Sequence, residues 1–220
     1  MIPDTPQARR QFIVDNTRLQ RPPHTPELQL HLADEITPIW RMTEEALAEI
    51  GLPPPFWAFA WAGGQALARY ILDNPAVVAG QAVVDFASGS GLVGIAAARA
   101  GAASVLAADI DGYCGQALAL NAQVNGVSVE FTDADLLDAP PPAWAQVILA
   151  GDICYEKPLA ERVMAWLGAG RAAGATVLIG DPGRSYFPRT GLTKLAEYQV
   201  PTTRELEDME VKKTAVWTLP

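Results

Sequence analysis

The sequence predicts an α/β fold in which a doubly wound, mostly parallel sheet is covered by helices. Three observations support this prediction: short apolar runs alternate with helical segments, the alternation begins near residue 82, and a glycine-rich turn follows the first run. Of the 220 residues, 50% are hydrophobic and 19% are charged, a globular composition. A chain of this length can bury one full core, so we expect one compact domain with an N-terminal extension.

The N-terminal extension, residues 1–54, is expected to be helical. Residues 7–19 have the pattern of one helix, which two prolines end, and residues 43–50 have the pattern of a second. Thr43 is the candidate N-cap of this second helix.

The main domain, residues 55–220, begins with an aromatic run over 56–61 that should be buried, followed by a helix over 64–72. Five apolar runs then have the length of buried strands, at 82–86, 104–108, 127–131, 147–150 and 175–179. Helical segments separate these runs at 92–100, 113–124 and 159–167. Such alternation implies parallel pairing through right-handed crossovers. Two more strands, at 195–200 and 215–219, flank a charged stretch at 204–213 and complete seven strands, one of them antiparallel near the C-terminus.

Composition argues against several classes of function. The two cysteines, Cys114 and Cys154, form no Cys-x-x-Cys pair, so we expect two buried thiols and no metal site. Both histidines, His24 and His31, lie in the extension, which leaves none for a Ser-His-Asp triad in the main domain. A formal charge of −9 and a pI near 4.7 disfavour nucleic acid and suit a cationic protein partner.

The sequence also indicates where in the cell the protein is expected to be. Gly, Asp or Pro interrupts the longest apolar runs before they could span a bilayer, so no membrane partner is expected. Residues 1–20 lack the apolar core of a secretory signal. We therefore expect a cytoplasmic protein.

The turn after the first strand is the main functional signal. Residues 89–94 have the G-x-G-x-x-G spacing of loops that approach a cofactor closely, which alone admits a nicotinamide dinucleotide or S-adenosylmethionine. Asp85 precedes this loop, and a buried carboxylate there would repel a pyrophosphate and pair with the sulfonium and ammonium groups of S-adenosylmethionine. We therefore expect a Rossmann-like domain that binds S-adenosylmethionine. Its contacts are expected to include Asp85, Ala87, Ser88, Gly89 and Gly91.

Two further strand ends supply acidic side chains. Asp109 lies roughly 20 residues past the loop, where a carboxylate can accept both hydrogen bonds of a ribose diol. Asp111 fits the N-terminus of the next helix at least as well. Asp135 is the candidate partner of an adenine amino group, with Asp133 as a competitor and a plain turn as the alternative. Neighbouring Ile110 and Leu136 complete the expected cofactor contacts.

The fourth strand leads into residues 151–155, at the switch in strand order where the reactive end of a ligand lies. Amino-methylating DNA enzymes place an Asp or Asn, two prolines and an aromatic residue here, a platform for a flipped base. Ile153 and Cys154 replace the prolines in this chain. The acceptor is therefore expected to be a small molecule or a protein side chain.

Several segments resemble the electron-transfer-flavoprotein β-subunit lysine methyltransferases, a family of class I (seven-β-strand) enzymes. The likeness rests on residues 56–70, 108–111 and 179–184 and on Asp152 with Tyr155, and it covers the chain from about residue 55. The resemblance implies a protein-lysine N-methyltransferase that uses S-adenosylmethionine and acts on the electron-transfer flavoprotein β subunit. It also implies that Asp152 and Tyr155 receive the lysine and that Trp61 packs beside the cofactor.

Alternatives stay open at several positions. Asp152 either orients the incoming lysine or caps the following helix, and Tyr155 either contacts the lysine or packs in the core. The turn at 181–184 borders the site or only shapes the chain, and Arg184 has no assigned catalytic role. Ala87 departs from the family, in which many members have a glycine. For the whole protein, the alternatives are a small-molecule N-methyltransferase and a nicotinamide-dependent oxidoreductase.

Overall fold

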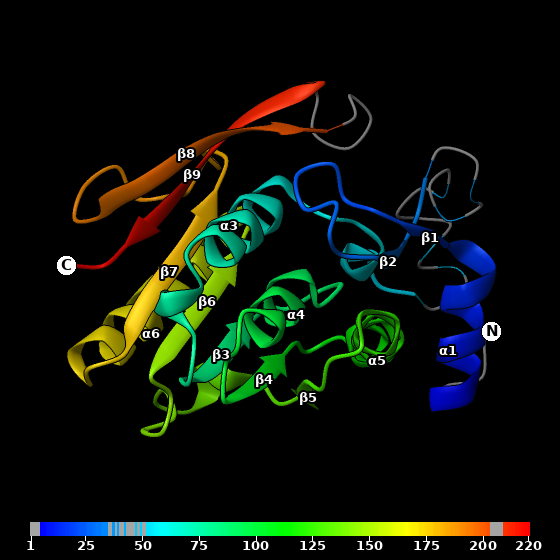
Figure 1. The fold of residues 1–220 in the computed structure, drawn as a ribbon, viewed down its shortest axis with the longest axis horizontal. Helices are drawn as coiled ribbons and strands as arrows, with labels where there is room; N and C mark the ends of the chain where they lie inside the picture. The colour runs from blue at the N-terminus through cyan, green and yellow to red at the C-terminus, as the bar shows by residue number, and fades with distance from the viewer. Residues whose placement is uncertain are drawn as a thin grey trace.

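The computed structural model describes residues 5–34, 37, 39, 42, 47, 49, 52–202 and 209–220. Its centre is a seven-stranded sheet in the order β5-β4-β3-β6-β7-β9-β8 (Figure 1). The strands are β3 (Ala82–Phe86), β4 (Ser104–Ala108), β5 (Glu130–Thr132), β6 (Val147–Gly151), β7 (Thr176–Asp181), β8 (Thr193–Pro201) and β9 (Val211–Thr218). In the described part of this sheet, β9 alone runs against the other strands. The predicted doubly wound, mostly parallel sheet is therefore confirmed.

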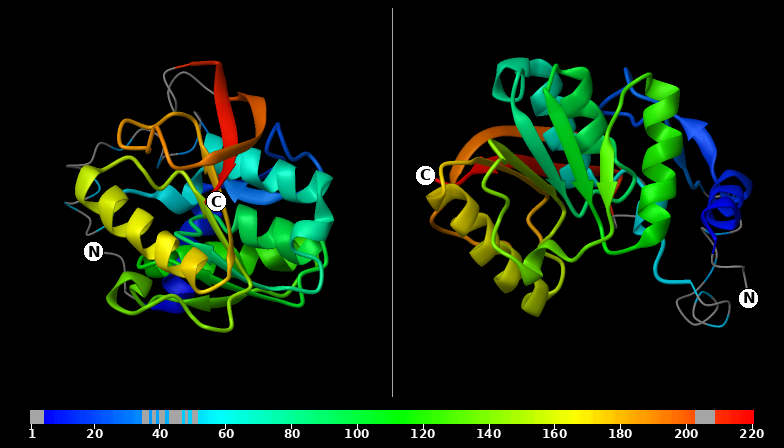
Figure 2. Two further views of the ribbon diagram at one scale, coloured as in Figure 1. Left: turned by 90° about the vertical axis from the view of Figure 1, so that its left-hand side faces the viewer. Right: turned by 90° about the horizontal axis from the view of Figure 1, so that it is seen from below.

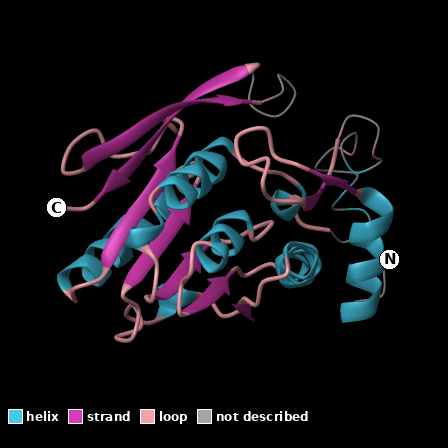
Figure 3. Ribbon diagram, in the orientation of Figure 1, coloured by secondary structure: helices cyan, strands magenta, loops and turns pink. Residues whose placement is uncertain are grey.

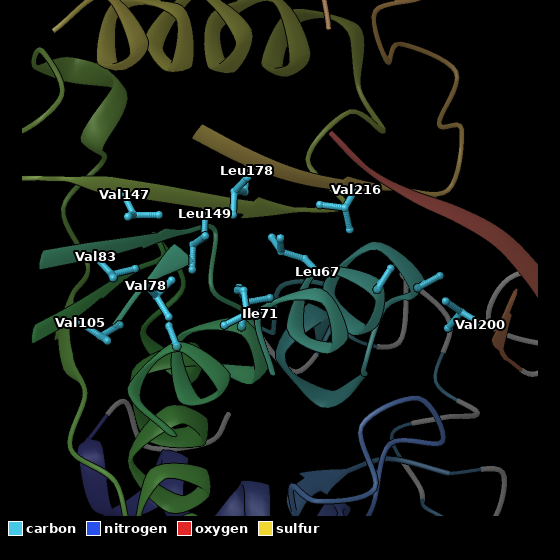
Figure 4. Packing of buried hydrophobic residues seen from close by; sticks show 14 residues of the cluster. Leu67, Ile71, Val78, Val83, Val105, Val147, Leu149, Leu178, Val200 and Val216 are labelled. Atoms are coloured by element: carbon cyan, nitrogen blue, oxygen red, sulfur yellow. The ribbon is translucent and has the colours of Figure 1, made fainter. Parts of the chain in front are cut away.

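Helices cover both faces of the sheet (Figures 2 and 3). One face carries α3 (Ala62–Asp73), α4 (Leu92–Arg99) and α5 (Gly112–Asn125), and the other carries α6 (Lys157–Ala172). Figure 4 shows Leu67 and Ile71 of α3 gathered with Val83, Val147 and Leu149 of the strands. Alternate strand residues face α6, so both faces of the central strands are apolar, as parallel strands require.

Local hydrogen bonds determine where several helices and strands begin and end. Asp111 accepts a hydrogen bond from the Tyr113 N–H at 2.9 Å and caps α5, which confirms its alternative role. The strand predicted at 127–131 begins only at Glu130, because the Val127 N–H bonds back to the Ala122 carbonyl at 3.1 Å and completes the end of α5. Of the charged stretch at 204–213, residues 204–208 lie outside the described residues, and residues 211–213 belong to β9.

The N-terminal extension is not purely helical, so that prediction was wrong in part. Helix α1 (Pro6–Asn16) ends before residue 19 because Thr17 is extended, and β1 (Arg18–Gln20) follows. β1 pairs antiparallel with β2 (Leu30–Leu32). In the second expected helix Leu47 and Glu49 are helical, whereas the proposed cap Thr43 lies outside the described residues. The domain boundary after residue 54 stays a prediction.

The β1–β2 hairpin is fixed to the main domain through Asn121 of α5. The His31 N–H donates to Asn121 Oδ1 at 2.7 Å, and Asn121 Nδ2 donates to the Ser90 carbonyl in the glycine-rich loop at 2.8 Å. Leu30 and its neighbours pack in the cluster that contains parts of α4 and α5. The extension therefore supports the glycine-rich loop through Asn121.

None of the helices in the described part of the chain has the length and apolar composition that a membrane span needs.

The N-terminus of α3 lies on β7 through two glycines. A Cβ atom on either Gly63 or Gly180 would fall far inside van der Waals contact with the carbonyl oxygen of the other. This contact brings the first N–H groups of α3 to the carboxyl ends of β6 and β7.

Replacing Gly180 with alanine is expected to lower the free energy of unfolding by about 2 to 3 kcal/mol, because the new methyl group meets backbone that cannot rotate away. The matched control is Gly168→Ala within α6, where an added Cβ meets nothing within 4 Å. This change should raise stability by about 1 kcal/mol, since alanine favours helix. Urea unfolding of both variants measures the difference, and equal effects would contradict the close contact.

Candidate active site

A cavity of about 490 Å³ lies at the carboxyl ends of the parallel strands, where the strand order switches between β3 and β6. Eleven of the candidate residues line it: Trp61, Asp85, Ala87, Ser88, Gly89, Asp109, Ile110, Asp135, Leu136, Asp152 and Tyr155. Gly91 is not among the lining residues. It begins α4 with φ 80°, and its missing side chain leaves room for Leu118.

Asp109 orients the glycine-rich loop. Its Oδ2 accepts a hydrogen bond from the Gly89 N–H at 2.9 Å, and its Oδ1 accepts one from the Asp111 N–H at 3.1 Å. The Cys114 side chain also hydrogen-bonds to this carboxylate, which has about four acceptor positions and can still face a diol. Asp109 therefore remains the candidate partner of a ribose diol, because Asp111 instead caps α5.

Asp85 is the most deeply buried carboxylate of the cavity, with 1% of its surface exposed. Its Oδ2 accepts a hydrogen bond from the Gly94 N–H at 2.7 Å. Burial raises the pKa of Asp85 to about 7, and the charge of Asp109 adds to the rise, whereas the bond from Gly94 opposes it. A cation bound beside this carboxylate would favour its ionised form.

The charges of the lining residues decide which cofactor fits. Five aspartates and two arginines line the cavity, Arg162 and Arg184 being the cations. This excess of carboxylate is unfavourable for a pyrophosphate and suits a cationic ligand such as S-adenosylmethionine. Asp135 also lines the cavity and Asp133 does not. Asp135 therefore remains the candidate partner of an adenine amino group, and Asp133 does not. Asp135 accepts a hydrogen bond from the Leu137 N–H at 2.9 Å.

Asp152 forms the other end of the cavity and has a positive φ of 58°. Its Oδ1 pairs with Arg184, at 2.8 Å from Nε and 2.6 Å from Nη2. Its Oδ2 accepts hydrogen bonds from the N–H groups of Gly63 and, at 3.3 Å, Gly64 at the start of α3. The alternative that Asp152 caps the following helix is therefore wrong, because Glu156 occupies the N-cap position of α6.

Arg184 is the main residue that sequence reasoning missed. Asp181 Oδ1 accepts hydrogen bonds from the N–H groups of Gly183 at 2.6 Å and Arg184 at 2.8 Å, and this turn aims the guanidinium at Asp152. The turn therefore does border the site. A signal was present in the sequence, because a buried carboxylate at a strand end needs a cationic or N–H partner.

Aromatic side chains line the end of the cavity that contains Asp152. The Phe56 ring centre lies 5.9 Å from that of Trp61 and 5.6 Å from that of Tyr155, and Phe59 lies 5.7 Å from Trp61. Tyr155 is 43% exposed, so the core-packing alternative is wrong. Phe56 and Phe59 also line the cavity, and their only signal in the sequence was the aromatic run itself.

The two thiols are buried, as expected. Burial raises the pKa of Cys154 to about 12 and that of Cys114 well above its usual value, so both stay protonated at neutral pH. In the described ranges, no group of three or more histidine, cysteine, aspartate or glutamate side chains could hold a metal ion.

The fold and the site together define a class I S-adenosylmethionine-dependent methyltransferase. The model of the ribosomal protein L11 methyltransferase (PrmA) family matches residues 65–155. The crystal structure of magnesium protoporphyrin IX methyltransferase from Synechocystis PCC 6803 with bound S-adenosylmethionine has the same fold. It superimposes with a TM-score of 0.52 at 14% identity, covering 71% of this chain and 78% of that one.

Relatives with higher sequence identity define the family more narrowly. The electron transfer flavoprotein beta subunit lysine methyltransferase of Xenopus laevis is 37% identical over 215 residues, covering 95% of this chain and 86% of that protein. Its counterpart from Mus musculus is 39% identical over 199 residues, covering 88% and 76%. The chain belongs to the electron transfer flavoprotein beta subunit lysine methyltransferase family.

Ala87 has a φ of 53°, a conformation that favours glycine. Replacing it with glycine is expected to raise the free energy of unfolding by about 1 kcal/mol, because relief of the Cβ clash exceeds the extra entropy of the unfolded chain. The matched control is Gly126→Ala, at φ 65° with open space around its Cβ, which should lose about as much. Urea unfolding measures both, and a destabilised Ala87→Gly protein would show that contacts of the methyl group dominate.

Proposed function

We propose that this protein transfers methyl groups from S-adenosylmethionine to a lysine of the electron transfer flavoprotein β subunit. The observation that carries the proposal is a single cavity with an acidic cofactor end and an aromatic acceptor end closed by Asp152. The names of the curated relatives support the substrate. The cytoplasmic location and the lack of a nucleic-acid partner stay predictions.

At the cofactor end of the cavity, the acidic residue at the end of each of three strands has its own proposed role. Asp85 faces the cationic methionine part, Asp109 the ribose diol, and Asp135 the adenine amino group. Ile110, which is 74% exposed, offers apolar surface to the adenine ring. The remaining proposed contacts are Trp61, Ala87, Ser88, Gly89, Gly91 and Leu136.

Bound in this cavity, S-adenosylmethionine supplies an electrophilic methyl group on a sulfonium sulfur. The protein aligns the acceptor with it, and alignment of the reacting atoms at about 3 Å supplies much of the rate. The aliphatic chain of the lysine lies against Phe56 and Tyr155, and the neutral amine reaches the methyl carbon beside Asp152. After transfer the methylated amine releases its extra proton to water.

The Asp152→Asn variant tests the division between the two ends. Asparagine keeps the shape but loses the charge that holds Arg184, so the lysine end loses its alignment. We expect methyl transfer to fall at least about 100-fold while the dissociation constant for S-adenosylhomocysteine changes less than about threefold. Single-turnover transfer and titration calorimetry measure the two quantities. Equal loss of both would contradict separate roles.

Asp85 predicts a pH dependence of cofactor binding. Its pKa of about 7 means that it is neutral below and ionised above this pH, and a cationic cofactor prefers the ionised form. Relative to Asp85→Asn, the wild-type affinity for S-adenosylmethionine should therefore rise about 10-fold from pH 6 to pH 8. Calorimetry at each pH measures the ratio, and a constant ratio would contradict pairing between Asp85 and the cofactor.

The substrate is tested with methyl-labelled S-adenosylmethionine, the purified electron transfer flavoprotein β subunit and, in parallel, a pool of small metabolites. We expect label on lysine of the protein, located by mass spectrometry. Label only in the metabolite pool would support the small-molecule alternative. Thermal stabilisation by S-adenosylhomocysteine but not by NADH would exclude the nicotinamide alternative.

A further inference from the structure

The carboxylate of Asp152 has no acceptor position left for a lysine. A carboxylate offers about four lone-pair sites on its two oxygens. Two donors of Arg184 meet Oδ1, and the N–H groups of Gly63 and Gly64 meet Oδ2. The side chain is also only 8% exposed. An incoming ammonium therefore meets a carboxylate whose charge and hydrogen bonds are already satisfied.

We propose that Arg184 is a positioning residue that offsets the charge of Asp152, so that the acceptor lysine reacts as the neutral amine. The inference rests on the lysine methyltransferase function proposed above. An isolated carboxylate beside an amine stabilises the ammonium form, which has no lone pair for attack, and an adjacent cation removes this effect. Asp152 can thus hold Arg184 and the start of α3 at this end of the cavity without stabilising the ammonium form of the lysine.

The position of Arg184 is fixed from three directions. Its backbone N–H is held by Asp181, its guanidinium donates to Asp152, and the guanidinium carbon lies 5.9 Å from the centre of the Trp61 ring. The other lining cation, Arg162, lies 3.7 Å from Asp135 at the cofactor end. Among the described lining residues, Arg184 is therefore the cation that serves the acceptor end.

Other titratable groups face the same end and enter the charge balance. Asp181 is 2% exposed, and burial raises its pKa to about 6. Burial also raises the pKa of Tyr155, which favours the neutral phenol. The titratable groups at the acceptor end are Asp152, Cys154, Tyr155 and Glu156 after β6 and Asp181 with Arg184 at the end of β7, while α3 contributes backbone N–H groups. From the cofactor end, Asp109 and Cys114 also act on Tyr155.

The reaction balances without a further reactant. The lysine ammonium first gives its proton to water. The nitrogen lone pair then forms a bond to the methyl carbon, the carbon–sulfur electron pair stays on sulfur, and a neutral thioether and a methylated ammonium result. Arg184 acts before the second step, by favouring the neutral amine.

The test is the pH dependence of single-turnover transfer to the protein substrate at saturating S-adenosylmethionine, between pH 6.5 and 10. Arg184→Gln leaves Asp152 uncompensated, so the midpoint of the profile should rise by about one pH unit. Asp152→Asn leaves Arg184 uncompensated, so its midpoint should fall by about one unit. The double variant restores the balance, and its midpoint should return to the wild-type value although transfer stays slow.

Two further variants distinguish a change in charge balance from a general loss of structure. Arg184→Lys keeps the charge but loses the two-pronged contact, so its rate should fall with little change in midpoint. Arg189→Gln removes a cation from the same loop at an exposed position with no partner among the described residues, and its profile should match that of the wild type. Calorimetry with S-adenosylhomocysteine confirms that each variant is folded.

Unmoved midpoints, with a uniform loss of rate at every pH, would overturn the inference and leave the proposed function intact. Failure of the wild-type protein to methylate any lysine would instead overturn the proposed function. Opposite shifts in the two single variants, cancelled in the double variant, would establish the charge balance.

Discussion

The carboxylate of Asp152 joins three parts of the chain, and the acceptor end of the cavity depends on this junction. It lies just after β6, accepts N–H groups from the start of α3, and pairs with the arginine that follows β7. A buried carboxylate is tolerated only when donors satisfy it, because the cost of removing its charge from water is large. The contact of Gly63 with Gly180 is what allows α3 to come close enough to supply them. The aromatic run before α3 is thereby held against the cavity.

Two buried carboxylates in one cavity have opposite electrostatic situations. Asp85 has one N–H donor from Gly94 and a raised pKa, so its charge is poorly compensated until a cation is present. Asp152 has donors on both oxygens, including a guanidinium. The environment of Asp85 therefore favours a bound cation, whereas the charge of Asp152 is already offset by Arg184. This difference matches a reaction between a cationic methyl donor and an uncharged amine.

Most of the sheet and the acidic residues that line the cavity were predictable from sequence, for physical reasons. Central parallel strands are buried on both faces, so β3 and β4 are continuous apolar runs with clear ends. Their carboxyl ends meet at one edge, which brings Asp85 and Asp109 together. The sequence indicates only that the buried carboxylate of Asp152 needs a cationic or N–H partner. The choice of Arg184 was not predictable, because it depends on the dihedral angles of a short turn. The hairpin in the extension was also missed, since strands of three residues carry too little periodicity.

The side-chain amide of Asn121 ties the first part of the chain to the glycine-rich loop. Its oxygen accepts from the backbone of His31 and its nitrogen donates to the backbone of Ser90, and the side chain is fully buried. Separating the hairpin would leave that oxygen unsatisfied, at a cost of about 1 to 3 kcal/mol. The hairpin and the loop therefore belong to one cooperative unit of local unfolding. Residues of the hairpin, which do not line the cavity, therefore help to hold the glycine-rich loop in place.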